Sequence, residues 1–151
     1  MRLFIDANVL FSAAHNPDGN AQALFSLARK GMVKLHCSRF ARDEAVRNIA
    51  LKFPHCREAL QVLLDEIEQV PEPQPHLVRS AISAGLPKKD APILAAAIAA
   101  EVDLLVTGDK RHFGPLFGQR VEGVIVLPPA DALALVLDRL EDSRAATSTI
   151  G

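Results

Sequence analysis

The sequence contains no tryptophan and no tyrosine, and aromatic residues make up only 5% of it. Their absence weakens any mode of RNA or single-strand binding that depends on stacking bases against aromatic rings. The formal net charge is only −1. Nucleic-acid contact would therefore need a local basic patch or bound cations, because the surface as a whole is not basic.

Cysteines and long apolar runs are scarce as well. Cys37 and Cys56 form no Cys-x-x-Cys pair and lack the histidine spacing of a zinc site, so we expect two free thiols in a reducing cytoplasm. No apolar run approaches the roughly 20 residues that a membrane span needs, so we expect no membrane association. Met1 and Arg2 lead directly into the first predicted strand, so we expect no signal peptide.

What the chain does contain is an alternation of short apolar runs and helical patterns. The runs of strand length fall at residues 3–5, 33–37, 103–107 and 123–127. Each run is nearly continuous, as expected when both faces of a parallel sheet are covered. Capped, amphipathic or alanine-rich patterns predict helices at residues 20–31, 38–53, 55–70, 76–85, 90–101 and 128–140.

This alternation predicts an α/β fold. We expect a three-layer sandwich with a mainly parallel central sheet of about four or five strands, flanked by helices. The length favours a single domain, which we place at residues 1–140. Residues 141–151 have little to bury and are expected to form a flexible C-terminal tail.

Acidic residues follow or precede the predicted strands at one edge of this sheet. Asp6 ends the first strand, and Asp109 follows the strand of "DLLVTG". Asp90 opens the helix that leads back to the start of that strand, and Glu44 lies in the first turns of the helix after residues 33–37. Ligands of parallel sheets bind outside the carboxyl ends of the strands, so we expect the four carboxylates to converge there.

Converging carboxylates repel one another unless a cation neutralises them. A site rich in oxygen, without sulfur and poor in imidazole, suits Mg²⁺ or Mn²⁺, and we predict one or two such ions. The predicted metal ligands are Asp6, Asp90, Asp109 and Glu44. Two ions at such a site form the usual clamp for in-line attack on a phosphodiester.

Each of these acids also has a simpler interpretation. Asp6 and Asn8 can form Asx turns, Asp90 can be only the N-cap of its helix, and Asp109 in "TGDK" can be an ordinary turn residue. No single acid decides between the interpretations, but the set of four favours a metal site.

Of the four predicted metal ligands, Glu44 is assigned on the weakest grounds. Its neighbour Asp43 is equally placed, and either can be a solvated position or a partner of the helix dipole. Thr107 and Asn8 are expected to orient a water or a carboxylate in the catalytic site. For Thr107, the role of a β-branched strand residue is nearly as good an interpretation.

Basic residues flank two of the acids. The candidate RNA-binding residues are Lys88, Lys89, Lys110, Arg111 and His112. A solvated surface is the commoner explanation for any one of them. For His112, phosphate binding and helix capping stay open.

Three segments together resemble PIN-domain proteins, the metal-dependent ribonuclease fold common among the toxins of prokaryotic toxin–antitoxin pairs. They are "FIDANVLFSA", "HCSRFARDEAVRNI" and "KKDAPILAAAIAAEVDLLVTGDKRHF". The last is the most specific, since an Asp opens an alanine-rich helix and an apolar strand then runs into Thr-Gly-Asp-Lys and a Phe.

The resemblance implies a set of acidic and supporting polar positions, which fall on Asp6, Glu44, Asp90, Asp109, Thr107 and Asn8. It also implies Mg²⁺ or Mn²⁺, hydrolysis of single-stranded RNA, a homodimer and, often, inhibition by an antitoxin protein.

Two other classes of protein fit less well. A haloacid-dehalogenase-like phosphatase would need an Asp where Asn8 stands, and a second carboxylate downstream of Asp109. A non-catalytic RNA- or partner-binding module would use the acids as helix caps. That module predicts no metal dependence and a fold that is indifferent to chelators.

Overall fold

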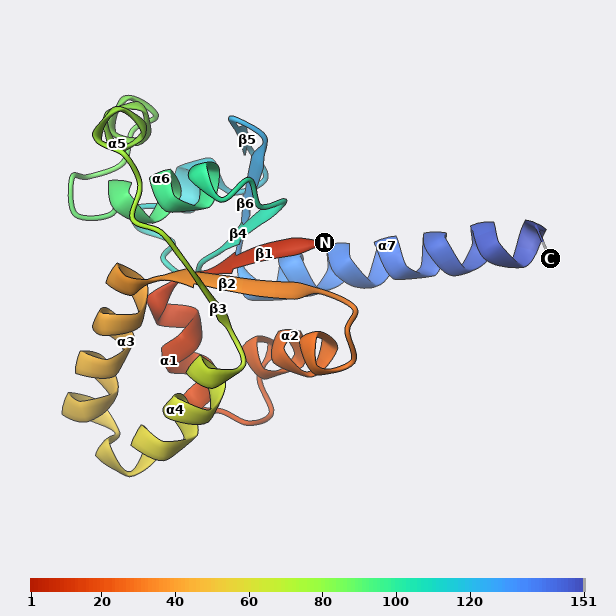
Figure 1. Cartoon of the computed structure of the whole chain (residues 1–151), viewed down its shortest axis with the longest axis horizontal. Coiled ribbons are helices and arrows are strands. Elements are labelled where there is room, and N and C mark those ends of the chain that lie inside the picture. The colour runs from red at the N-terminus through yellow and green to blue at the C-terminus, as the bar shows by residue number, and fades with distance from the viewer. Residues whose placement is uncertain (151) are drawn as a thin grey trace.

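A six-stranded sheet forms the centre of the molecule (Figure 1). The computed structural model describes residues 1–150, with the side chains of residues 1–147. The strands are β1 (Arg2–Ile5), β2 (Lys34–Ser38), β3 (Glu68–Val70), β4 (Leu104–Val106), β5 (Arg120–Val121) and β6 (Val124–Leu127). Their order is β3-β2-β1-β4-β6-β5, and every neighbouring pair is parallel except β5 and β6. The mainly parallel sheet is confirmed, but the expected number of four or five strands was too low.

Helices cover both faces of this sheet. They are α1 (Ala7–His15), α2 (Asn20–Arg29), α3 (Arg39–Lys52), α4 (Arg57–Asp65), α5 (Pro75–Ser83), α6 (Ala91–Ala99) and α7 (Pro129–Ile150), with 3-10 turns η1 (Pro54–Cys56) and η2 (Gly114–Leu116). Helices α1 to α4 lie on one side of the sheet and α5 and α6 on the other, which gives the three predicted layers (Figure 1). Helix α7 packs against α2 and β4 and then extends away from the body. No helix in the described part of the chain is both long and apolar enough to cross a membrane.

The core is formed by the central strands and by small residues of α6. Leu3, Phe4 and Ile5 of β1 are fully buried, as are all three residues of β4. The alanine-rich sequence of α6 buries residues 93–97 and lets this helix pack closely against the sheet. Because β1 and β4 are covered on both faces, their sequences are continuously apolar.

Several helix boundaries differ from the sequence-based expectation. Helix α1 was not expected, and α4 ends at Asp65, because residues 68–70 leave the predicted helix and form the edge strand β3. Helix α3 begins as expected, since Ser38 Oγ accepts a hydrogen bond of 3.2 Å from the N–H of Ala41. Asn20 does not cap α2, whose N-cap residue is Gly19.

Helix α7 continues to Ile150, into the segment for which a flexible tail is predicted. Residues 141–147 are exposed throughout, in agreement with the few and small apolar side chains that this segment has to bury. The flexibility of this segment and the domain limits at residues 1–140 stay predictions.

The strand order brings the ends of β1 and β4 together. The N–H of Asp6 donates to the carbonyl oxygen of Val106 at 3.0 Å, and the N–H of Thr107 donates to that of Leu127 at 3.0 Å. The residues that follow β1 and β4 therefore meet at the carboxyl edge of the sheet.

Candidate metal-binding site

A first group of polar side chains at this edge, the Asp6 cluster, consists of Asp6, Asn8 and Thr107. Asp6 is the N-cap of α1, and its Oδ1 accepts from the N–H of Ala7 at 2.7 Å. Its Oδ2 accepts from Thr107 Oγ1 at 2.8 Å and from Asn8 Nδ2 at 3.2 Å. Both oxygens of this buried carboxylate are thus hydrogen bonded, as a buried charge requires.

The other atoms of the Asp6 cluster connect β1 to the loop after β4. Asn8 Oδ1 accepts from the N–H of Gly108 at 2.7 Å, and Thr107 Oγ1 accepts from the N–H of Asp109 at 3.2 Å. A Cβ atom on Gly108 would lie 3.3 Å from Asn8 Oδ1, which is tighter than nearly all such contacts. Asn8 and Thr107 therefore fix the position of Asp6 relative to Asp109.

The carboxyl group of Asp6 has a raised pKa. Burial raises the pKa of its carboxyl from 3.8 to about 6, against the lowering effects of the hydrogen bonds from Thr107 and Ala7. The negative charges of Glu44 and Asp90 raise this pKa further. These two acids from α3 and the start of α6 are thus close enough to act electrostatically on Asp6.

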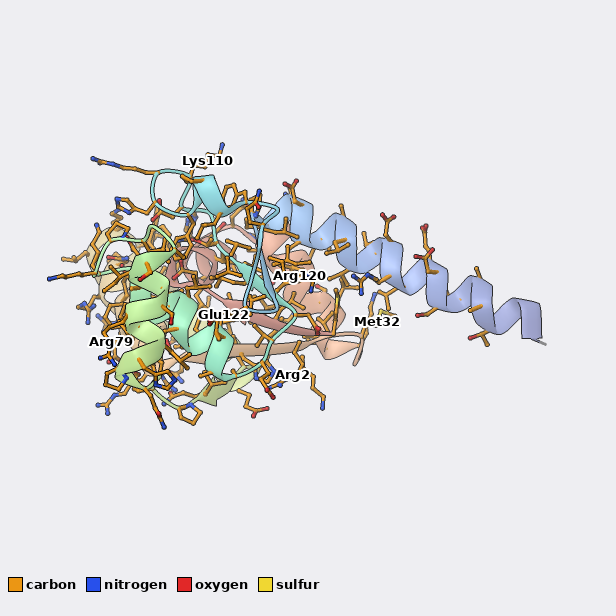
Figure 2. All side chains as sticks on the ribbon, turned by 90° about the horizontal axis from the view of Figure 1, so that it is seen from above. Arg2, Met32, Arg79, Lys110, Arg120 and Glu122 are labelled. Atoms are coloured by element: carbon orange, nitrogen blue, oxygen red, sulfur yellow. The ribbon has the colours of Figure 1, made fainter. Side chains whose placement is uncertain are left out.

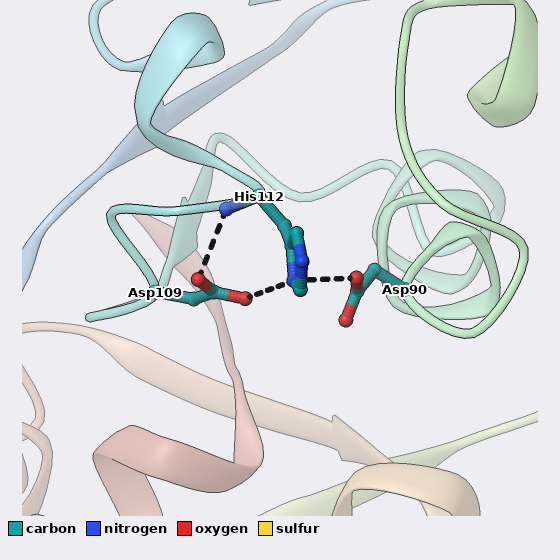
Figure 3. Close-up of side chains that lie close together, drawn as sticks. All are labelled: Asp90, Asp109 and His112. Carbon is teal, nitrogen blue, oxygen red and sulfur yellow. Dashed lines mark hydrogen bonds and ion pairs between the residues drawn. The ribbon is translucent and has the colours of Figure 1, made fainter.

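A second group, the His112 cluster, consists of Asp90, Asp109 and His112 (Figure 3). The imidazole lies between the two carboxylates, with Nδ1 at 3.0 Å from Asp90 Oδ2 and 3.1 Å from Asp109 Oδ2. The main-chain N–H of His112 donates to Asp109 Oδ1 at 3.1 Å. One potential ligand atom from each of the three residues lies within 4.8 Å of the other two.

Asp90 occupies the N-cap position of α6 but does not cap it, since no main-chain N–H of the described helix bonds to its side chain. Its Oδ2 is buried and, within the described part of the chain, has no partner in hydrogen-bonding geometry. The contact with His112 is close enough for an ion pair, but the ring nitrogen is directed correctly only for Asp109. Burial raises the pKa of Asp90, opposed by the adjacent His112 and reinforced by Asp109.

The structure places His112 differently from the sequence analysis, which grouped it with the flanking basic residues. Its ring turns back into the acidic cluster and is 22% exposed. The spacing Asp-x-x-His after a strand was the available signal, because a tight turn brings residues i and i+3 together. Lys88, Lys89, Lys110 and Arg111 are exposed, and Lys110 lies on the loop after β4 (Figure 2).

Glu44 is half-buried on α3, whereas the side chain of Asp43 is 52% exposed. Asp43 Oδ2 lies 3.8 Å from Arg39 Nε in an i, i+4 ion pair. Of this pair, Glu44 is the acid whose negative charge contributes to the raised pKa of Asp6. The four acids from separate segments therefore lie toward one edge of the sheet, and their roles as metal ligands stay predictions.

The residues present fit a divalent cation. The site offers carboxylates from three strand or helix ends, one imidazole, and a buried carboxylate oxygen of Asp90 that no described residue hydrogen bonds. A cation between these groups would supply the missing partner, and it would offset both the burial and the repulsion by Glu44 and Asp90 that raise the pKa of Asp6.

Comparison with known proteins gives a family match. The sequence model of the PIN domain matches residues 2–111 of the chain. No curated protein matches it.

Solved structures with similar folds include VapBC2 from Rickettsia felis bound to a DNA fragment from its promoter. That structure has a TM-score of 0.65 and 16% identity, covering 85% of this chain and 98% of the other. PAE2754 from Pyrobaculum aerophilum has a TM-score of 0.64 and 17% identity, covering 91% and 96%. VapC20 from Mycobacterium tuberculosis, a toxin that cleaves the sarcin-ricin loop, has a TM-score of 0.51 and 13% identity, covering 80% and 97%. At these identities the likeness is one of fold.

Proposed function

The chain belongs to the PIN-domain family, and from this premise we propose that it is a Mg²⁺- or Mn²⁺-dependent endoribonuclease that hydrolyses phosphodiester bonds of single-stranded RNA. The main support is the position of Asp6, Glu44, Asp90 and Asp109 toward one sheet edge, beside an Asp90 oxygen to which none of the described residues donates a hydrogen bond. Cleavage of the sarcin-ricin loop by the similarly folded VapC20 supports a nuclease activity.

The proposed ligands of one or two ions are the carboxylates of Asp6, Asp90 and Asp109, with Glu44 completing the site directly or through a water. A divalent ion held there supplies Lewis-acid chemistry: it lowers the pKa of water and stabilises negative charge on phosphoryl oxygens. The carboxylate of Asp6, with a pKa of about 6, is mostly ionised at neutral pH and is available as a ligand.

The neighbouring polar groups would orient this site and attract the substrate. Thr107 and Asn8 hold the Asp6 carboxylate in one orientation through their hydrogen bonds of 2.8 and 3.2 Å. The exposed Lys88, Lys89, Lys110 and Arg111 flank the acids and would attract the RNA backbone. Phosphate contacts of this kind carry no sequence information, so they set affinity and not the target.

We further propose that the protein acts in the cytoplasm as a homodimer and as the toxin of a toxin–antitoxin pair. The similarly folded VapBC2 was solved bound to a DNA fragment from its promoter. The toxin role predicts that expression of the wild-type chain arrests growth and that expression of Asp109→Asn does not. A small reading frame immediately upstream whose product relieves the arrest would identify the antitoxin.

The nuclease proposal is tested with labelled single-stranded RNA, incubated with the purified chain in Mg²⁺, in Mn²⁺ and in excess EDTA. We expect cleavage only with a divalent ion, and at least about a 100-fold loss in Asp6→Asn and in Asp109→Asn. Asp138→Asn, which removes an exposed acid on α7, is the matched control and should cleave normally.

Cleavage that persists in EDTA, or in either active-site variant, would contradict the proposed roles. A folded chain that binds RNA without cleaving it under any of these conditions would support the non-catalytic binding module instead.

A further inference from the structure

We propose that His112 contributes Nδ1 as a ligand to the divalent ion held by Asp90 and Asp109, and that this nitrogen makes the site prefer Mn²⁺ over Mg²⁺. The inference depends on the proposed function, because it concerns the same site, and it adds the residue that selects the metal.

The spacing of the three donor atoms suits a shared ion. Nδ1 of His112 lies 3.0 and 3.1 Å from the nearest oxygens of Asp90 and Asp109. Adjacent donors of an octahedral ion with bonds of 2.0–2.1 Å are about 3 Å apart. The imidazole nitrogen is therefore already at the separation from both carboxylates that two neighbouring positions of one coordination sphere require.

A proton on His112 Nδ1 can provide a hydrogen bond to only one of the two carboxylates. The nitrogen carries at most one hydrogen, and its direction meets hydrogen-bonding geometry toward Asp109 but not toward Asp90. Asp90 Oδ2 consequently stays buried without a hydrogen bond in the described part of the chain. A cation contacting all three atoms would satisfy Asp90, Asp109 and His112 together.

The position of the imidazole is fixed by the main chain. The N–H groups of His112 and Phe113 bond to the side chain and the carbonyl of Asp109, each at 3.1 Å. The ring of Phe113 is 1% exposed and holds the turn against the core. Ligands whose orientation is imposed by such packing and hydrogen bonds hold a metal more tightly than free side chains.

The donor set determines which ion is favoured. Mg²⁺ binds almost exclusively oxygen and releases water reluctantly. Mn²⁺ shares its preference for carboxylates but, as a transition metal, also binds nitrogen donors such as imidazole. Replacing one oxygen by Nδ1 of His112 therefore raises the affinity for Mn²⁺ and contributes little to that for Mg²⁺.

The test measures metal binding in the absence of RNA. Metal-free full-length protein is titrated with Mn²⁺ by electron paramagnetic resonance, and Mg²⁺ affinity is obtained by competition. We expect His112→Ala to weaken Mn²⁺ binding by about 10–100-fold with little change for Mg²⁺. His76→Ala, which removes an exposed histidine on α5, should bind both ions as the wild type does.

Pulsed electron paramagnetic resonance of the bound Mn²⁺ shows directly whether a nitrogen atom is among its ligands, through the hyperfine coupling to ¹⁴N. A ¹⁴N coupling of an imidazole should be present in the wild type and in His76→Ala, and absent in His112→Ala. His112→Asp, which restores a charged oxygen donor, should lose the coupling and lower the preference for Mn²⁺ over Mg²⁺. Circular dichroism of each variant establishes that it is folded.

The outcomes separate the two proposals. Wild-type protein that binds Mn²⁺ without a ¹⁴N coupling, or as tightly as His112→Ala, would overturn the role of His112 and leave the nuclease proposal standing. Wild-type protein that binds neither ion at millimolar concentration would overturn both.

Discussion

The Asp6 cluster and the His112 cluster lie side by side at one sheet edge, yet they differ in how completely their oxygens are hydrogen bonded. Both carboxylate oxygens of Asp6 accept hydrogen bonds from the protein, whereas Asp90 Oδ2 accepts none from the described residues. Satisfied buried networks make a structure rigid, and incompletely satisfied ones are expected where a ligand completes them. The hydrogen bonds of the Asp6 cluster therefore hold its carboxylate in a fixed position, and under the proposed function the His112 cluster is the part that a bound ion would complete.

The largest predicted effect concerns the charge of Asp6 in the metal-free protein. Its pKa is 3.8 in the unfolded chain and about 6 in the folded one, so between these values only the folded state holds the proton. The stability contributed by this group is present below about pH 4 and is lost as the pH rises through about 6, by on the order of 3 kcal/mol. Urea unfolding of wild type and Asp6→Asn between pH 4 and 7.5 measures the difference.

Relative to the wild type, metal-free Asp6→Asn should gain stability as the pH is raised. Excess Mn²⁺ at neutral pH should stabilise the wild type and have much less effect on the variant. Identical pH dependence in the two proteins would show that the Asp6 cluster does not carry the buried charge described here.

A substitution of Glu44 tests whether helix α3 contributes a functional side chain to the site. Glu44→Gln should reduce RNA cleavage by about 10–100-fold, equivalent to about 1.4–2.7 kcal/mol, because it removes a charge that faces Asp6. Asp43→Asn is the neighbouring control and should cleave at the wild-type rate, since Asp43 is half exposed and paired with Arg39. If Asp43→Asn lost RNA cleavage and Glu44→Gln kept it, Asp43 would be the acid of α3 that contributes to the site.

Thr107 tests the rigidity of the Asp6 cluster. Thr107→Val removes a hydroxyl that donates to Asp6 and accepts from the N–H of Asp109, and should cost about 1–2 kcal/mol in urea unfolding at neutral pH. This hydrogen bond lowers the pKa of Asp6, so its removal should raise that pKa further. The loss of stability with rising pH should therefore extend to a higher pH in the variant than in the wild type.

Thr107→Ser is the matched control, since it keeps the hydroxyl and loses only a methyl group. It should leave the pH dependence unchanged. A Thr107→Val variant whose stability responds to pH as the wild type does would remove Thr107 from this account.

The smallest effect is predicted at the other end of the molecule. Deleting residues 141–151 should change the free energy of unfolding by less than about 0.5 kcal/mol and leave RNA cleavage unchanged, because residues 141–147 are exposed. Thermal unfolding and the RNA assay measure this. Aggregation of the truncated chain would move the domain limit beyond residue 140.

The sequence predicted the parts of the fold that depend on continuous burial. Strands β1, β2, β4 and β6 are short apolar runs, and the rule that parallel strands share a carboxyl edge was enough to bring Asp6 and Asp109 together. The strands that it missed, β3 and β5, have three and two residues and lie at the sheet edges. Such strands bury too little to leave an apolar pattern.

Helix α1 and the direction of the His112 side chain were not predicted from the sequence, for related reasons. Helix α1 follows the first strand without a loop, because Asp6 directly follows β1 and serves as the N-cap of α1, so no separate helix start was predicted at residues 7–15. His112 looks like one more basic residue until the turn after Asp109 directs its ring inward. Side-chain direction in a turn depends on main-chain hydrogen bonds that no periodicity reports.

The central claim is that a divalent cation binds among the carboxylates at this edge, and crystals soaked in MnCl₂ test it most directly through the anomalous signal of manganese. We predict a strong peak contacting Asp90 and Asp109, on the side that faces Asp6. A map with no peak at this edge under saturating Mn²⁺, or one in which a lysine or arginine side chain fills the space between these carboxylates, would contradict the account.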